Sequence, residues 1–387
     1  PVDALFQMSL STRVTKLFGI KHPLVLPGMS WISTPQLVAA VSNAGGLGIL
    51  ATGPLSPAET RESIREIRRL TDKPFGIGAT LLMPGAEENA RVALEEQVPV
   101  INFSLGKGDW IIKGAHSYGG KVIATVVNEK HAKKAESLGA DCLMVTGHEA
   151  AAHGGDVTSL VLVPCIAAKV GVPVICAGGI ANGQGLLAAL SLGADAVAMG
   201  SRFAVTQESP LASSAKDMIV SHSESDTIYG KNFDGLYARV LRTKASEEAM
   251  RRPVNPLLAA YRSFEAARMI NMPLWKVVPG LLTQWNKMYL LSLFGSATQR
   301  LIAATVDGDL ENGVQFVGQS QGLINDIPSV QQLVDRCLEE AQVKHTELGL
   351  LQNAFPGQEQ EQEQDKISFH SRSIPHQQQE QAHSISV

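Results

Sequence analysis

The chain has 387 residues, of which 44% are hydrophobic, and a formal net charge of −4 at pH 7. This length exceeds that of a usual single domain, but α/β barrels run to about 250 residues or more as one unit. Because the net charge is slightly negative, the composition does not indicate a basic surface that would bind phosphates, and nucleic acid is not expected as a partner. No stretch of about 18 apolar residues indicates a membrane span, and no secretory signal pattern opens the sequence, so we expect a cytoplasmic protein without a membrane partner.

The cysteines are scattered along the sequence and include no Cys-x-x-Cys pair. Because most of them lie in apolar runs, we expect reduced, buried thiols rather than disulfides. They are Cys142, Cys165, Cys176 and Cys337. Histidines and carboxylates do not recur at the spacing of metal ligands either, so no metal site is predicted.

Up to residue 206, short apolar runs alternate with helical patterns. The expected strands are 22–29, 47–51, 75–82, 98–105, 122–127, 142–146, 174–177 and 196–200. The expected helices are 34–43, 57–69, 86–96, 129–138, 160–169 and 183–192. Strands that are apolar on both faces and alternate with helices form a parallel sheet covered by helices. Eight such units favour closure into a (β/α)8 TIM barrel over an open doubly wound sheet, so we assign residues 1–206 to a barrel domain.

Beyond the barrel the pattern changes to polar, helical sequence, and we assign residues 207–317 to a helical lid. Its stretch 271–305 is rich in Trp, Leu, Met and Tyr, and would wall a substrate pocket, form a homodimer face or pack the lid on the barrel. Basic lid residues either reach a phosphate or form solvated surface pairs. These residues are Arg239, Arg242, Lys244, Arg251 and Arg252.

The C-terminal part of the chain divides into a segment that we expect to be ordered and one that we do not. Residues 318–350, with a last helix at 330–343, are expected to pack back on the barrel. The Gln/Glu-rich tail 351–387 has too few apolar residues to bury and is expected to be disordered.

The ends of the seventh and eighth predicted strands carry Gly178-Gly179 and Gly200-Ser201. Glycine lets a backbone N–H approach an anion without a Cβ in the way. Two such loops side by side, each opening a helix, form a phosphate cup at the position where barrels bind phosphate. The sequence therefore predicts a phosphorylated ligand here.

His153 lies in the loop after the sixth predicted strand and is flanked by small residues. Because an imidazole exchanges protons near neutral pH, His153 is the candidate catalytic acid or base; a structural hydrogen bond is the alternative. His148, at the strand end, is a weaker candidate. Cys176 precedes the glycine pair, but its apolar setting argues against a nucleophile.

Flavin mononucleotide (FMN) fits these features best, with one phosphate in the cup and a flat ring across the barrel mouth. The motifs of a Rossmann nicotinamide domain and of a nucleoside triphosphatase are missing from the sequence. A phosphosugar or another phosphorylated ligand remains open on the residues alone. The candidate cofactor residues are Gly28, Met29, Ser30, Gly78, Ala151, Gly178, Gly179, Met199, Gly200 and Ser201.

Several phrases of the sequence together resemble the nitronate monooxygenase (2-nitropropane dioxygenase-like) family, whose relatives include FMN-dependent enoyl-acyl-carrier-protein reductases. The phrases are 27–30, 39–48, 147–153, 177–185, 199–206 and 318–324. The resemblance implies an FMN-bearing barrel with a lid, the flavin ring near Met29 and Ala151, and His153 as the active-site histidine. The family's Glu-Ala-Gly-Gly-His appears here at 149–153 with two added methyls. An asparagine and a glutamine of the family appear as Gly78 and Thr146, which removes side-chain hydrogen bonds to the ring.

Three functions fit this resemblance. The first, which we take as the prediction, is FMN-dependent oxidation of alkyl nitronates by O₂ to carbonyl compounds and nitrite, with His153 positioning the nitronate or deprotonating a nitroalkane. The alternative is NAD(P)H-dependent reduction of an enoyl thioester, to which the phrase 28–34 is somewhat closer. In the third, the barrel has no turnover and serves as an FMN-binding partner.

Overall fold

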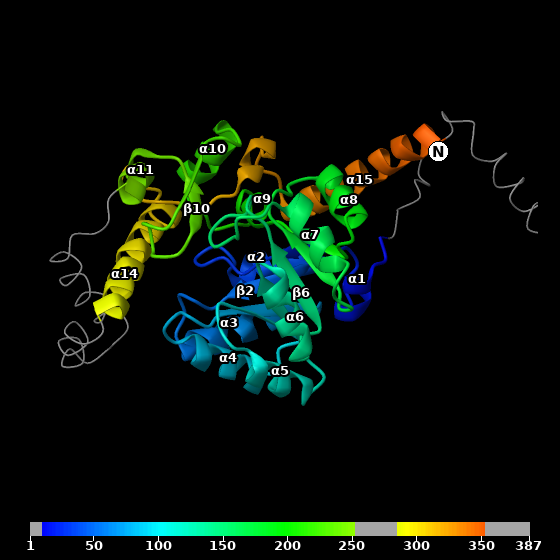
Figure 1. The fold of residues 1–387 in the computed structure, drawn as a ribbon, viewed down its shortest axis with the longest axis horizontal. Helices are drawn as coiled ribbons and strands as arrows, with labels where there is room; N and C mark the ends of the chain where they lie inside the picture. The colour runs from blue at the N-terminus through cyan, green and yellow to red at the C-terminus, as the bar shows by residue number, and fades with distance from the viewer. Residues whose placement is uncertain (1–9, 252–284, 353–387) are drawn as a thin grey trace, which may run out of the picture. The chain divides into compact units, whose positions relative to one another are not determined.

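The computed structural model describes residues 10–251 and 285–352. It contains a closed barrel of eight parallel strands, in which each strand pairs with the next along the chain and β8 pairs with β1. Figure 1 shows the fold, with β2 and β6 of the barrel labelled. The strands are β1 (Leu24–Leu26), β2 (Leu47–Ala51), β3 (Phe75–Thr80), β4 (Val100–Ser104), β5 (Lys121–Val126), β6 (Cys142–Thr146), β7 (Val174–Ala177) and β8 (Ala196–Ala198). The predicted TIM barrel is confirmed.

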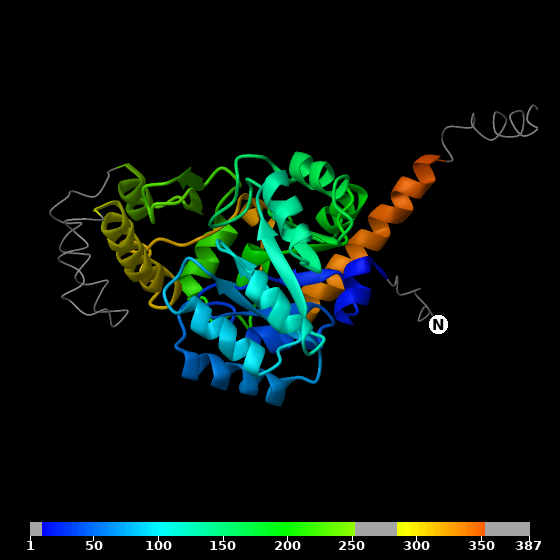
Figure 2. The same ribbon diagram turned by 60° about the horizontal axis from the view of Figure 1, so that its bottom comes forward.

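Helices follow the strands and form the outer layer of the barrel (Figure 2). They are α2 (Pro35–Asn43), α3 (Pro57–Leu70), α4 (Ala86–Glu95), α5 (Asp109–His116), α6 (Glu129–Ser137), α7 (Ser159–Ala167) and α8 (Gly183–Ser191), and α1 (Arg13–Phe18) precedes β1. Local signals set these bounds. The start of α3, for example, combines a capping box of Ser56 and Glu59 with a proline in the first turn.

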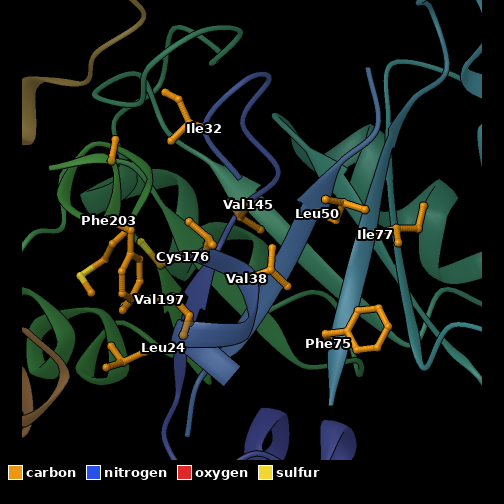
Figure 3. Close-up of a cluster of buried hydrophobic side chains, with 14 of the residues drawn as sticks. Leu24, Ile32, Val38, Leu50, Phe75, Ile77, Val145, Cys176, Val197 and Phe203 are labelled. Carbon is orange, nitrogen blue, oxygen red and sulfur yellow. The ribbon is translucent and has the colours of Figure 1, made fainter. Parts of the chain in front are cut away.

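Alternate strand residues divide the core into an outer and an inner layer. In the outer layer, Leu50 of β2 and Ile77 of β3 join Val38 of α2 between sheet and helices (Figure 3). The inner layer fills the barrel with residues such as Val100 and Ile123, and side chains of α1 join this cluster. The barrel is therefore a packed core rather than a pore.

Toward the carboxyl ends of β4 and β5, the inward-facing positions become polar. Two residues after Val100 and Ile123 come Asn102 and Thr125, which the strand alternation turns to the same face. The side-chain amide of Asn102 donates to Thr125 Oγ1 at 2.9 Å, and Asn102 is buried. On these two strands the apolar filling of the barrel thus ends in the polar pair Asn102 and Thr125.

The segment after β8 contains both helices and a small sheet. Its helical elements are α9 (Gly200–Ala204), α10 (Ser213–Ser221), α11 (Lys244–Arg251), α14 (Trp285–Thr305), η1 (Gln319–Leu323) and α15 (Val330–Gln352). The strands β9 (Thr227–Gly230) and β10 (Ala238–Leu241) pair antiparallel as a hairpin. An entirely helical lid is therefore wrong for these strands, whose short apolar runs pack with α11 and α14 residues in a separate cluster that includes Phe233 and Val240. Residues 252–284, which hold the first part of the predicted apolar stretch 271–305, lie outside the described residues, as does the predicted disordered tail from 353 onward. The tail's residues 351 and 352 belong instead to the end of α15, so the prediction of disorder is wrong for them.

Contacts divide the chain into a unit that ends at Ala341 and a second that begins at Gln342. In the first unit, the C-terminal segment is bonded to the barrel: Arg202 Nη2 lies 3.1 Å from Asp326 Oδ1, and the amide of Gly183 donates to Glu340 at 2.8 Å. In the second unit, Lys344 pairs with Glu347 at 2.8 Å. None of the helices in the described part of the chain has the length and apolar character needed to cross a lipid bilayer.

Candidate active site

The two glycine loops follow neighbouring strands, because Ala177 of β7 pairs with Ala198 of β8. Gly178 and Gly179 hold φ angles of 108° and 79°, which only glycine adopts readily. Within the described residues, the amides of Gly178, Gly179, Gly200 and Ser201 donate to no acceptor. Unpaired amides gathered at the ends of two adjacent strands are suited to binding an anion.

Gly178 lies directly against the histidine loop. A Cβ at this position would come within 3.0 Å of the backbone nitrogen of Ala150. On the other side, Ser201 Oγ accepts from the amide of Gly318 at 2.9 Å, which leaves the hydroxyl hydrogen for another acceptor. The loops after β6, β7 and β8 and the segment at Gly318 thus meet in one place.

The residues after β1 form a second part of the mouth. A Cβ on Gly28 would lie 3.7 Å from the Cα of Gly78, and one on Gly200 would lie 3.3 Å from the sulfur of Met29. Met29 is therefore next to the glycine loops. Ser30 Oγ lies instead beside Gly53, beyond the end of β2.

Met199 takes a different position from the other candidate cofactor residues. Its amide donates to Val25, which continues the barrel ladder, and its side chain is 1% exposed in the outer core. Met199 is therefore part of the barrel core, with its amide already bonded and almost none of its surface exposed.

His153 pairs with a carboxylate that the sequence did not reveal. Its Nε2 lies 2.7 Å from Asp234 Oδ2, in the turn between β9 and β10. The side chain of Asp234 is 3% exposed and that of His153 is 24% exposed. Nδ1 of His153 has no hydrogen-bond partner in the described part of the chain. Because 81 residues separate the pair, no local spacing could have predicted it.

The hairpin is joined to the histidine loop through the backbone as well. Ala152 and Arg239 exchange two hydrogen bonds, of 3.2 and 3.0 Å. The guanidinium of Arg239 donates from Nε and Nη2 to the carbonyl of His148, at 3.1 and 2.9 Å. Arg239 is buried, and this burial lowers its pKa. Of the predicted basic cluster, Arg242 and Arg251 pair with Glu247, and Arg252 lies outside the described residues.

The contacts of His148 indicate a structural role. Its Nδ1 lies 3.0 Å from the carbonyl oxygen of Gly155, a contact in which the imidazole nitrogen must be the donor. Its ring packs edge-on against Tyr229, with the centroids 4.5 Å apart. His148 therefore braces the loop that carries His153.

The cysteines differ from the sequence expectation at one position. Cys142, Cys176 and Cys337 are buried, and burial raises the pKa of the Cys176 thiol to about 12. Such a thiol stays protonated and is a poor nucleophile. Cys165 is exposed, so the expectation of a buried thiol is wrong there. It lies on α7, and the apolar run that suggested burial extends onto the solvent side of the helix, where Leu160 and Val161 are also exposed.

A sequence model of the nitronate monooxygenase family matches residues 11–95 and 85–340. The chain belongs to this family. It is 34% identical over 352 residues to the (3aS,4S,5R,7aS)-5-hydroxy-7a-methyl-1-oxo-octahydro-1H-indene-4-carboxyl-CoA dehydrogenase of Rhodococcus jostii. The match covers 89% of this chain and 99% of that protein. A probable nitronate monooxygenase of Staphylococcus aureus is 30% identical over 61% of this chain and 79% of its own length. Among solved structures, FabK from Thermotoga maritima is 37% identical with a TM-score of 0.74, over 87% of this chain and 98% of its own. The protein is thus an oxidoreductase of this family.

Proposed function

We propose that this member of the nitronate monooxygenase family is an FMN-dependent oxidoreductase whose small-molecule substrate is an acyl thioester. The observation that carries the substrate class is the similarity to the Rhodococcus carboxyl-CoA dehydrogenase over 99% of that protein's length. The nitronate monooxygenase relative covers less of this chain, 61%. We therefore rank the thioester above the nitronate, which the sequence alone had favoured.

The residues at the barrel mouth fit FMN. The unpaired amides of Gly178, Gly179, Gly200 and Ser201 are the donors that a terminal phosphate needs, and the Ser201 hydroxyl can add one more. Gly28, Met29, Gly78 and Ala151 would edge the flat ring. The polar pair Asn102 and Thr125 would offer the ring hydrogen-bonding groups at the ends of β4 and β5. Bound FMN would supply the acceptor or donor of two electrons for the reaction.

In this proposal His153 takes up or releases the proton of the reaction. A thioester carbonyl acidifies the hydrogens on the adjacent carbon, so redox chemistry at this carbon and its neighbour requires a group that takes or gives one proton. Since Nε2 is held by Asp234, Nδ1 is the atom available for the transfer. An imidazole performs this exchange near neutral pH.

Nitronate oxidation by O₂ to a carbonyl compound and nitrite is the second candidate. The family match and the Staphylococcus relative favour it. In this reaction His153 would position the nitronate, or would take the proton from the carbon next to the nitro group when the neutral nitroalkane is the substrate.

Anaerobic mixing of the FMN-loaded protein separates the candidates. We expect loss of flavin absorbance with a saturated acyl-CoA, or with NAD(P)H followed by reoxidation on adding an enoyl-CoA. Indifference to every thioester, together with O₂ consumption on propionate 3-nitronate in a separate assay in air, would overturn the first candidate in favour of the second. No response to any of these substrates would leave an FMN-binding protein without turnover. The variant His153→Asn should retain FMN and lose turnover by about 10²-fold or more.

A further inference from the structure

We propose that Asp234 is a positioning residue for His153: it holds the proton on Nε2 and keeps Nδ1 free for the substrate. The β9–β10 hairpin would then be part of the catalytic apparatus and not only a cover. This inference rests on the proposed role of His153 in proton transfer.

The contacts of Asp234 define how it holds the imidazole. Oδ2 lies 2.7 Å from His153 Nε2, and Oδ1 accepts from the amide of Leu236 at 3.0 Å. Both carboxylate oxygens are thus engaged, and the side chain has one orientation. An ionised carboxylate only accepts hydrogen bonds, so the hydrogen must lie on Nε2. Neutral His153 is thereby fixed as the tautomer whose Nδ1 carries a lone pair.

The hairpin does not need this contact in order to dock. Two backbone hydrogen bonds join Ala152 to Arg239, and Arg239 also donates twice to the carbonyl of His148. Phe233, next to Asp234, packs in the separate apolar cluster of the lid. Because these bonds and contacts already secure the hairpin, a buried carboxylate within hydrogen-bond distance of the His153 imidazole calls for another role.

The surroundings of the ring support a fixed orientation. The ring of Phe316 packs edge-on against His153, with the centroids 5.9 Å apart, and Phe233 packs in turn against Phe316 at 5.7 Å. The imidazole is therefore held by an aromatic contact and by a carboxylate at Nε2. A ring held in this way gives and takes its proton at one defined atom.

The first test is the tautomer of His153 in the unaltered protein, read from the imidazole ¹⁵N chemical shifts. This measurement needs neither substrate nor turnover. We expect the Nε2–H form of the neutral ring. Finding the Nδ1–H form would overturn the inference directly.

The second test is Asp234→Asn, which replaces the acceptor by a group that can also donate. When the carboxamide NH₂ faces Nε2, the proton moves to Nδ1, so we expect the ¹⁵N shifts to report the Nδ1–H form and kcat to fall about 10²- to 10⁴-fold, with KM changed far less. Asp234→Glu should restore the Nε2–H form and part of kcat. Asp226→Asn, which removes a carboxylate bonded to Ser223 near the start of β9, is the matched control and should change neither.

The outcomes distinguish this inference from the proposed function. An unchanged tautomer and an unchanged kcat in Asp234→Asn would refute the positioning role even if thioesters are turned over. Conversely, a tautomer that follows residue 234 in a protein that acts on no thioester would support the positioning role and reject the substrate assignment.

Discussion

Ala152, which precedes His153, has a φ of 53°. This is a left-handed backbone conformation that residues other than glycine rarely adopt. The residue exchanges two hydrogen bonds with Arg239, and this pairing fixes the loop at that point. Strain of this kind is kept where the surroundings determine the backbone, often next to a functional group. At the residue scale, Ala152 is therefore an unfavourable residue type for the backbone conformation that it adopts.

Replacing Ala152 by glycine removes that strain. The left-handed conformation costs an alanine about 1–2 kcal/mol, and the extra freedom of glycine in the unfolded chain costs about 0.4–1 kcal/mol. We expect Ala152→Gly to leave the free energy of unfolding, measured in urea, unchanged or raised by up to about 1 kcal/mol. Ala150→Gly, at a buried position without positive φ, should lower it by about 1 kcal/mol or more. Equal losses in the two variants would contradict this explanation.

Gly178 presents the opposite case, a residue that must stay glycine. Its φ of 108° and the 3.0 Å approach of a Cβ to Ala150 both oppose a side chain. We expect Gly178→Ala to move the loop amides and weaken FMN binding at least tenfold, about 1.4 kcal/mol, by fluorescence titration. Gly171→Ala, whose nearest contact would be an ordinary 3.5 Å to Glu136, should bind FMN like the parent protein. Unchanged FMN affinity in Gly178→Ala would argue against the cup.

At the element scale, the strands and the parts of the site that follow them could be predicted from local sequence. The predicted ranges 47–51, 142–146 and 174–177 agree with β2, β6 and β7, since each is an apolar run bounded by turn residues. At 196–200 the strand ends earlier, because Gly200 opens α9 instead. Barrel topology then brings the glycine pairs together, as parallel strands present their carboxyl ends on one side.

The remaining parts of the site depend on contacts between distant segments. The hairpin strands β9 and β10 are four residues each and lack a strong alternation, so pairing with each other decides their conformation. Asp234 is one acidic residue among many until the hairpin brings it to His153. Asn102 did carry a signal, an amide within an apolar strand, which indicates a polar partner such as Thr125.

The stabilisation that ion pairs between α9 and α15 provide depends on pH. Asp326 bonds Arg336 at 2.7 Å and the buried Arg202 at 3.1 Å, and the hydrogen bond from Arg336, with the charge of Arg202, lowers the pKa of the Asp326 carboxyl. Because the folded pKa lies below the unfolded value near 3.9, this stabilisation is complete above about pH 4 and is lost as the pH falls through the lowered folded pKa.

Asp326→Asn tests this connection. We expect a loss of about 1 kcal/mol at pH 7, since solvent screens a side chain that is 37% exposed, and no difference from the parent protein once the pH is below the folded pKa. Urea unfolding at both pH values measures it. Asp72→Asn, which removes an exposed pair with Lys73, should change little at either pH. A loss of the same size at both pH values would show that packing, and not charge, explains the effect.

At the scale of the whole molecule, the proposed cofactor site is built from segments far apart in the chain. Gly318, near the C-terminal end of the first unit, is joined to Ser201 of the β8 loop, and a Cβ there would fall 2.8 Å from the carbonyl oxygen of Glu149. Next to it, the amide of Gln319 donates to the same carbonyl at 2.9 Å. A ligand bound to the loops after β7 and β8 would therefore stabilise the barrel together with the segment that closes on it.

This arrangement predicts how the melting temperature responds to flavins. FMN at 100 times its Kd adds about 2.7 kcal/mol to a protein that binds it only when folded. For the unit that ends at Ala341, the usual unfolding entropy per residue converts this into a rise of about 4 °C. Riboflavin has the same ring but no phosphate, so it should give a clearly smaller rise at the same concentration, and added inorganic phosphate should reduce the FMN effect. Equal shifts with FMN and riboflavin would mean that ring contacts hold the cofactor and that the amides of the β7 and β8 loops serve another purpose.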